Sequence, residues 1–309
     1  MATRLKIKVG SATLTEADVH AFECAYQVNE IPYLRLTIRD GDVASAGFER
    51  ANDDNYAPGE KVTVHGGIDD AGHLIFSGII IETCVFLDAE KLTGLTLTAK
   101  GEAIKLLEHP VSFLSNEEIK DKALIEQVAK LSAKYTFKDI ATLAENKIKH
   151  AQFAAYQQTP WQIIFARMIE NGAVFCPSPD GDSLINLAKF KPEAAEPFAL
   201  YELHKSSVRI DTQSMIKEIS AAAWDIKAQA LSAPAKGNIG GFKQWKNADQ
   251  VLKRGALARI ESAPLTKAQL DAGANAGGKF SPIGQLSGTV DRRTTGDKEG
   301  RRVKAPESH

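Results

Sequence analysis

The sequence predicts an α+β protein that is mainly antiparallel β, and three features of the chain support this prediction. In the first hundred residues, short runs alternate apolar and polar side chains, which is typical of strands with one buried face. In the middle of the chain, apolar residues recur twice at helical spacing. Between residues 173 and 226, strand-like runs return and are separated by turn-forming residues.

Four alternating runs in the first hundred residues predict strands, and they are Leu5–Val9, Leu34–Arg39, Val62–Val64 and Leu95–Ala99. Residues that favour turns lie between them, in the segments Asp40–Asp42, Tyr56–Gly59 and Asp69–Gly72. The last of these turns joins two strand-like segments into a predicted hairpin, Val62–Ile68 and His73–Leu87. Short strands at this spacing favour a small barrel or sandwich over alternating β–α–β units.

Two helices are predicted in the middle of the chain. The first covers residues 117–134, with Asn116 as its N-cap and an apolar stripe of Leu124, Ile125, Val128 and Leu131. The second covers residues 160–171, where Thr159 can cap the start, Pro160 suits the first position and Gly172 can end the helix. Its core face is predicted to consist of Trp161, Ile164, Phe165, Met168 and Ile169.

The rest of the chain returns to β structure and then loses clear periodicity. Ala173–Cys176 and Leu184–Leu187 are predicted to form a hairpin around the turn Ser178–Asp182. Further strands are predicted at Val208–Ile210 and Met215–Ile226.

Three segments near the C-terminus carry weaker patterns. Residues 232–241 are predicted to form a loop because Pro and Gly are frequent there. Residues 266–276 have a helical composition. From Ser281 onward turn formers and charges are frequent, so we expect this tail to be poorly ordered unless a partner holds it.

Composition excludes several classes of protein. The chain has 309 residues, with 38 Lys and Arg against 39 Asp and Glu, which gives a formal net charge of -1. This balance argues against a nucleic-acid-binding protein that acts through a strong basic field. A chain of this length suggests two domains, each large enough to bury a core.

Cysteine usage and hydropathy predict a protein that folds in the cytosol. Cys24, Cys84 and Cys176 are far apart, form no CxxC pair and are predicted to be buried small hydrophobic residues. Because no disulfide framework is expected, a reducing compartment is favoured. The N-terminus lacks the continuous apolar run of a signal peptide, and the most apolar stretch, Phe76–Leu87, is too short to span a bilayer.

No residue pattern predicts a catalytic, cofactor-binding or metal site. His65 and His73 flank a predicted turn and could meet across strands, but no third ligand is evident, so surface or structural roles are favoured. Two pairs of carboxylates occur in predicted turns, Asp69 with Asp70 and Asp180 with Asp182. They are candidates for paired carboxylates or a calcium loop, but Asp is favoured in turns for its own backbone hydrogen bonds.

Other motifs also fall short of a site. The segment Gly237–Gly241 lacks the GxGxxG register, and neither a GxSxG elbow nor a P-loop occurs. Trp161 is predicted to face the core, which leaves Trp224 and Trp245 as the tryptophans free to bind a glycan. We therefore expect a protein that is not an enzyme, with no catalytic residues, no cofactor and no metal.

Two segments in the first half of the chain resemble one family. Asn55–Val64 leads through a short turn to Leu74–Ile80. This arrangement resembles the hairpin PG-x-x-(V/I)-x-(V/I) … (I/F)-F-x-G-(I/V)-(I/V) of the VgrG and phage late-control protein D superfamily, the baseplate hubs of contractile injection systems. The family's next strand and helical turn resemble Leu95–Gly101 with Ile104–Leu107.

Three later segments extend the resemblance to residues 20–230. Phe113–Asn116 with the helix 117–134 resembles the segment that leaves the family's first barrel. Gln157–Phe175 is similar to the helix–strand unit (E/T)-x-W-x-(F/I)-(L/I)-x-R-x-x-E-x-G-x-x-(F/V). Ala223–Lys227 resembles the "W-D" strand of the second barrel.

The resemblance implies two barrel-like β-domains joined by a helical segment, in a homotrimer with pseudo-six-fold symmetry. The expected divisions are a first hub domain at 1–110, a helical connecting segment at 111–175, a second hub domain at 176–280, and a tail at 281–309 that starts a link to the spike. Full VgrG proteins continue into an oligosaccharide-binding-like domain and a β-helix spike. We therefore expect either a spike on a separate chain or a sequence that is the hub fragment of a longer protein.

The leading hypothesis is a structural hub of a contractile injection machine, either a type VI secretion system or an extracellular injection particle. It would adapt the hexameric tail tube to the trimeric spike. The implied partners are two further copies of the chain, an Hcp-like tube protein, spike-tip and baseplate proteins, and effector cargo, without nucleic acid or stable membrane insertion. The protein would be cytoplasmic during assembly and would then leave the cell within the particle, without a cleaved signal.

Two alternatives remain open. One is a phage tail baseplate hub of the late-control D type, which the sequence does not separate from the leading hypothesis. The other, from a different class, is an all-β glycan-binding or tail-associated hydrolase module. That module would need a concave site with exposed aromatic residues or two facing carboxylates.

Overall fold

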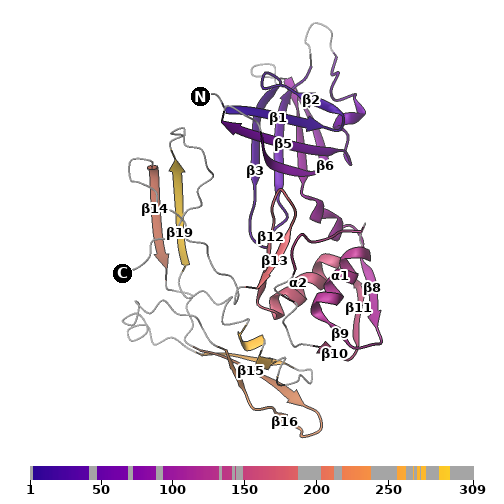
Figure 1. The fold of residues 1–309 in the computed structure, drawn as a ribbon, viewed down its shortest axis with the longest axis vertical. Coiled ribbons are helices and arrows are strands. Elements are labelled where there is room, and N and C mark those ends of the chain that lie inside the picture. The colour runs from indigo at the N-terminus through magenta and orange to yellow at the C-terminus, as the bar shows by residue number, and fades with distance from the viewer. Residues whose placement is uncertain are drawn as a thin grey trace. The chain divides into compact units, whose positions relative to one another are not determined.

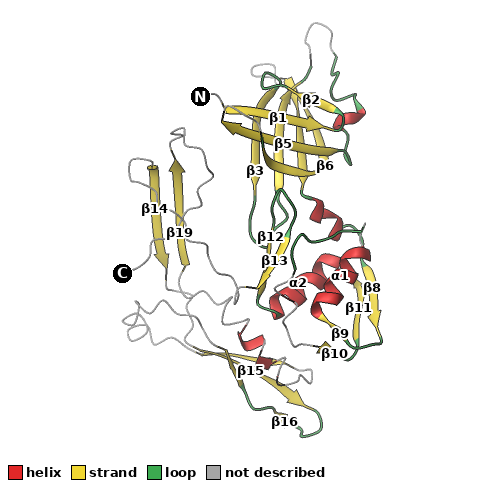
Figure 2. Ribbon diagram, in the orientation of Figure 1, coloured by secondary structure: helices red, strands yellow, loops and turns green. Residues whose placement is uncertain are grey.

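The computed structural model describes residues 3–41, 47–68, 72–87, 93–131, 134–140, 143, 149–186, 203–211, 218–237, 256–261, 267, 270–271, 273–275 and 285–292. The chain forms two compact units. Unit 1 consists of Met1–Ala141, Ala151–Phe165 and Phe175–Leu184, and unit 2 consists of Thr142–His150, Ala166–Val174 and Ile185–His309. Most of the described elements are antiparallel strands, with few helices (Figure 1 and Figure 2). The prediction of a mainly antiparallel β protein is therefore confirmed.

Unit 1 contains a seven-stranded antiparallel sheet with the order β2-β1-β5-β6-β7-β4-β3. Its strands are β1 (Thr3–Val9), β2 (Ala12–Leu14), β3 (Val19–Ala25), β4 (Tyr33–Arg39), β5 (Lys61–Ile68), β6 (His73–Leu87) and β7 (Thr93–Lys100). All four predicted runs and both arms of the predicted hairpin lie in these strands. The two edge strands, β2 and β3, were not predicted, because β2 has only three residues and four successive residues of β3 are exposed.

β6 belongs to both walls of the curled sheet, which forms a half-barrel. Its first part pairs with β5, placing Gly78 opposite Val62, and its second part pairs with β7, placing Val85 opposite Leu95. The register shifts between Ile80 and Glu82, and such a bulge bends and twists a strand. A Cβ atom at Gly78 would lie 2.3 Å from the carbonyl oxygen of Lys100, so the two strands can approach closely only with glycine at this position.

The concave side of the half-barrel is the core of unit 1. Alternate residues of each strand are buried there, as the period-two pattern predicted. The buried members include Ile7, Val9, Leu34, Leu36, Ile38, Val62, Val64, Phe76, Ile80, Leu95, Leu97 and Ala99.

Short strands and helices follow the sheet along the chain. They are η2 (Glu102–Leu106), β8 (Val111–Ser115), β9 (Ile119–Lys120), α1 (Asp121–Leu131), β10 (Lys149–His150), β11 (Phe153–Gln158), α2 (Pro160–Glu170), β12 (Ala173–Cys176) and β13 (Ser183–Asn186). One short helix, η1 (Asp54–Tyr56), lies earlier, between β4 and β5. β8 pairs with β11, and β12 pairs with β13 in the predicted hairpin.

The predicted start of the first helix is wrong. α1 begins at Asp121 rather than after Asn116, because Ile119 and Lys120 are taken up by strand β9. Leu124, Ile125 and Val128 of the predicted stripe are fully buried, whereas Leu131 at the last position is exposed.

The second helix lies where it was predicted. Its N-terminus is a reciprocal capping box, because the Gln162 N–H donates to Thr159 Oγ1 at 3.3 Å and the Thr159 N–H donates to Gln162 Oε1 at 2.9 Å. Ile164 and Met168 are buried as expected, and Ile163, outside the predicted face, is buried too. The buried surface of α2 is therefore wider than a single stripe.

Unit 2 contains a four-stranded sheet and a separate two-stranded ribbon. The sheet consists of β15 (Glu218–Asp225), β16 (Ala230–Leu231), β17 (Ala235–Gly237) and β18 (Ala256–Glu261), with β18 parallel to β15. The ribbon consists of β14 (Leu203–Asp211) and β19 (Gln285–Arg292), which are antiparallel. One face of the sheet is covered by the helical residues Leu270 and Ala274.

These elements confirm the predicted strands at 208–210 and, for its described residues up to Asp225, at 215–226. Two other expectations are corrected. Ala235–Gly237 is a strand inside the predicted loop 232–241, and Gln285–Arg292 is a strand inside the predicted disordered tail. Both pair with partners distant in the sequence, which local composition does not report. Residues 238–241 and 293–309 lie outside the described residues.

The described strands of unit 2 do not by themselves make a barrel, so the second barrel-like domain stays a prediction. In the segments that the structure describes, no helix is long and apolar enough to cross a membrane.

Candidate functional site

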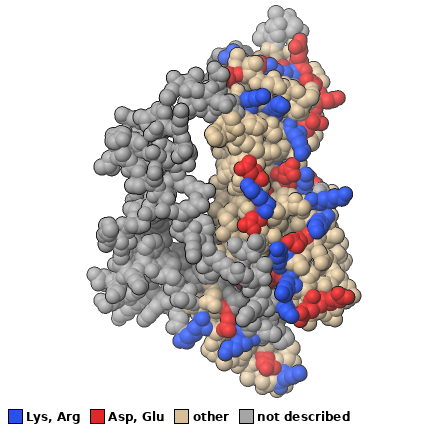
Figure 3. Space-filling model, viewed as in Figure 1, with Lys and Arg blue, Asp and Glu red and all other residues tan. Residues whose placement is uncertain are grey.

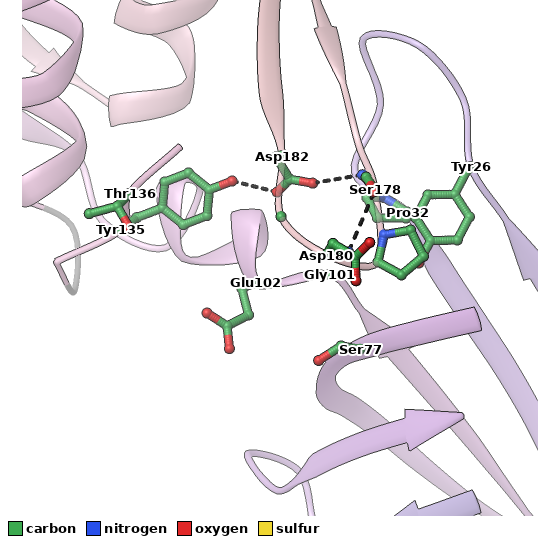
Figure 4. Close-up of a pocket in the computed structure, with 12 residues that line it drawn as sticks. Tyr26, Pro32, Ser77, Gly101, Glu102, Tyr135, Thr136, Ser178, Asp180 and Asp182 are labelled. Carbon is green, nitrogen blue, oxygen red and sulfur yellow. Dashed lines mark hydrogen bonds between the residues drawn. The ribbon is translucent and has the colours of Figure 1, made fainter. Parts of the chain in front are cut away.

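A polar cavity of about 230 Å³ lies in unit 1, where segments far apart in the sequence meet (Figure 4). It is lined by residues of the β3–β4 connection, the start of η2, the segment at Tyr135 and the turn Ser178–Asp182. This volume is below the roughly 300–1,000 Å³ of a typical small-molecule pocket.

Asp182 is the buried carboxylate beside this cavity. The Tyr135 hydroxyl donates a hydrogen bond to Oδ2 of Asp182, and the Ser178 N–H donates to Oδ1 at 3.3 Å (Figure 4). Burial raises the pKa of Asp182 above its ordinary value, although both hydrogen bonds act in the opposite direction. Burial and the nearby Asp182 raise the pKa of Tyr135, which keeps its hydroxyl protonated as a donor.

Backbone hydrogen bonds fix the same junction. The Lys138 N–H donates to the Asp182 carbonyl at 2.8 Å, and the Leu184 N–H donates to the Asp139 carbonyl at 2.8 Å. The segment around Lys138 thus lies along β13 like a short extra strand, with a parallel bridge between Asp139 and Ser183.

Asn29 connects the half-barrel to β12. Its N–H donates to the Phe175 carbonyl at 2.8 Å, and its Oδ1 accepts from the Phe175 N–H at 2.9 Å. Asn29 has a φ of 66°, a left-handed conformation that Asn tolerates better than most residues. Through these two hydrogen bonds, Asn29 pairs with Phe175 of β12 as a residue of a neighbouring strand would.

Glu102 is another of the carboxylates that line the cavity. It pairs with Lys61 Nζ at 3.2 Å and with Lys105 Nζ at 3.5 Å. Burial raises the pKa of Glu102, but the two lysines outweigh burial and hold this pKa below its ordinary value. Asp182 and Glu102 are thus each engaged with protein partners, and Asp180 of the turn Ser178–Asp182 lines the cavity as well.

Of the candidate residues from the sequence, Asp180 and Asp182 both line the polar cavity, whereas the two histidines are not brought together. The register pairs His65 with Leu74 and His73 with Gly66, so the two histidines are not opposite each other. Among the described residues, no group of three His, Cys, Asp or Glu side chains could hold a metal ion. Asp180 and Asp182 lie in the predicted turn, whereas Asp69, Asp70 and Trp245 lie outside the described residues.

Three further residues test the burial predictions. Trp161 is half-buried and packs against Phe165 and Phe175, in line with a core-facing position. Trp224 is 43% exposed. Cys84 is exposed rather than buried, because it falls on the convex side of β6, so the prediction for this cysteine is wrong.

Tyr135, Asn29 and Glu102 were missed by reasoning from the sequence. Tyr135 and Asp182 are 47 residues apart, and Asn29 and Phe175 are 146 apart. No motif or periodicity marks these residues, since their roles arise from contacts between distant segments.

The surface carries mixed charge and scattered apolar side chains. On the face drawn in Figure 3, Lys and Arg side chains of the described residues are interspersed with Asp and Glu. Exposed apolar residues of unit 1 include Tyr156, which is 81% exposed, and Leu114 on the neighbouring strand.

Three solved structures with the same fold are tail proteins, two of them from prophages. The tail protein from Neisseria meningitidis MC58 has a TM-score of 0.59, with 13% identity over 88% of this chain and 75% of its own. The 43 kDa tail protein of prophage MuSo2 from Shewanella oneidensis has a TM-score of 0.59, with 10% identity over 90% of this chain and 77% of its own. The prophage tail protein gp18 from Listeria monocytogenes EGD-e has a TM-score of 0.53, with 12% identity over 84% of this chain and 72% of its own.

The protein therefore has a phage-tail-protein fold, which confirms the resemblance at this coarser level. No curated protein matches the sequence. Residues 1–300 match the model of the Alg8 N-terminal domain, and the chain belongs to this family.

Proposed function

We propose that this chain is a structural hub of a contractile injection machine, where it adapts the hexameric tail tube to the trimeric spike. The observation that carries the proposal is the fold shared with phage tail proteins over 84% to 90% of the chain. The protein works as a scaffold and catalyses no reaction. Of the three carboxylates that line its polar cavity, Asp182 and Glu102 are held by protein partners, as expected of a structural role.

The segments that resemble VgrG and late-control D proteins support the proposal, because each falls on a defined element. The PG hairpin corresponds to β5 and β6, where the Gly59 N–H donates to the Ile80 carbonyl at 2.8 Å. The helix–strand segment corresponds to α2 and β12, and the "W-D" segment lies at the end of β15.

The proposed partners are two further copies of the chain, an Hcp-like tube protein, spike-tip and baseplate proteins, and effector cargo. The protein assembles in the cytoplasm and leaves the cell within the particle. A type VI or extracellular particle is favoured, with a phage baseplate hub as the alternative within the same class. Sheath and tube genes beside the gene for this chain would support the former, and capsid genes the latter.

Light scattering on the purified protein tests the oligomeric state. The expected mass is three times the 33.5 kDa of one chain, and tube protein made in the same cell should be captured with it. A monomer at high concentration that captures no tube protein would contradict the proposal.

One observation favours a glycan-binding module as a second candidate. Trp224 is exposed beside Leu231 on the β15–β16 hairpin, and exposed tryptophan is suited to stacking on a sugar ring. Binding to purified cell-wall glycan that Trp224→Ala abolishes would support this candidate. Binding equal in the wild type and the variant, or no binding at all, would remove it.

A further inference from the structure

We draw no further inference here: the strongest candidate, the patch of exposed apolar side chains at Leu114 and Tyr156 on the β8–β11 sheet of unit 1, carries nothing because nothing in the described part of the chain shows what covers it.

Discussion

At the scale of single residues, Asp18 joins three parts of the half-barrel. Its carboxylate accepts hydrogen bonds from the N–H and hydroxyl of Thr15 and forms an ion pair with Arg50. Arg50 also donates to the Arg39 carbonyl at 2.6 Å, so the guanidinium bridges the turn before β3 and the end of β4. The hydrogen bonds from Thr15, with those from Arg50, lower the pKa of Asp18 to about 2.

This lowered pKa predicts an acid-sensitive contribution to stability. Because the folded-state pKa lies below the unfolded value of 3.8, the contribution is complete above that value and is lost as pH falls towards 2. We expect Asp18→Asn to cost roughly 1 kcal/mol at pH 7, since the site is partly exposed. Urea unfolding between pH 2 and 7 should show a difference that shrinks in acid, and the exposed Glu49→Gln serves as a control. A constant difference across this range would contradict the assignment.

The contribution of Asp182 to stability should have a pH dependence opposite to that of Asp18. Burial raises the pKa of Asp182, so its charged form destabilises the fold as pH rises from the unfolded value through the folded one. Tyr135→Phe leaves the buried carboxylate with fewer donors and should cost about 1–3 kcal/mol at pH 7, and less in acid. Asp182→Asn removes the charge and should cost less than Tyr135→Phe. Denaturant melts at pH 4 and pH 7 measure both, and equal costs at the two pH values would refute this explanation.

At the scale of elements, Gly78 lets β6 serve both walls of the half-barrel. An added Cβ atom would meet the Lys100 carbonyl oxygen at 2.3 Å and the Phe76 ring at 2.7 Å. The first contact is with backbone, which cannot move without shifting β7. We expect Gly78→Ala to cost about 1–3 kcal/mol, as overpacking does, in thermal melts. Gly273→Ala, where an added Cβ meets nothing within 4 Å and φ is not left-handed, is the control without crowding.

The capping box of α2 gives a second prediction for an element. Thr159→Ala removes the side-chain acceptor for the Gln162 N–H and should cost about 1 kcal/mol, measured by chemical denaturation. Thr159→Ser keeps the acceptor and should restore most of the loss. If Ser and Ala behave alike, the hydroxyl does not stabilise this helix.

Elements with strong local patterns were predictable from the sequence, and others were not. Two examples are the alternation in Leu34–Arg39 and the Thr159–Pro160 start of α2. Each could be predicted because burial or capping shows as a pattern within a few residues. α1 starts late because Ile119 and Lys120 form a strand, and β19 forms inside a segment of turn formers because β14 pairs with it. In both cases a partner far along the chain overrides local preference.

At the scale of the whole molecule, the half-barrel ends in edge strands, and among the described residues β3 pairs with β4 alone. An edge strand such as β3 is costly for a free protein, because its unpaired N–H and C=O groups invite aggregation. A protein with the proposed role functions inside an assembly of identical copies. The near-zero net charge fits such a role, since it adds little repulsion between copies.

The sequence by itself determined the mainly antiparallel β class, most strands of the half-barrel and the position of α2, because period-two and 3.6-residue patterns are local records of burial. The sequence also resembles the hubs of contractile injection machines. The phage-tail-protein fold confirms this resemblance at a coarser level. Only the tertiary structure decided that Tyr135 holds Asp182, that Asn29 joins β12, and that β3 is left as an edge. These features depend on which distant segments meet, and that depends on packing the whole chain rather than on any short stretch of it.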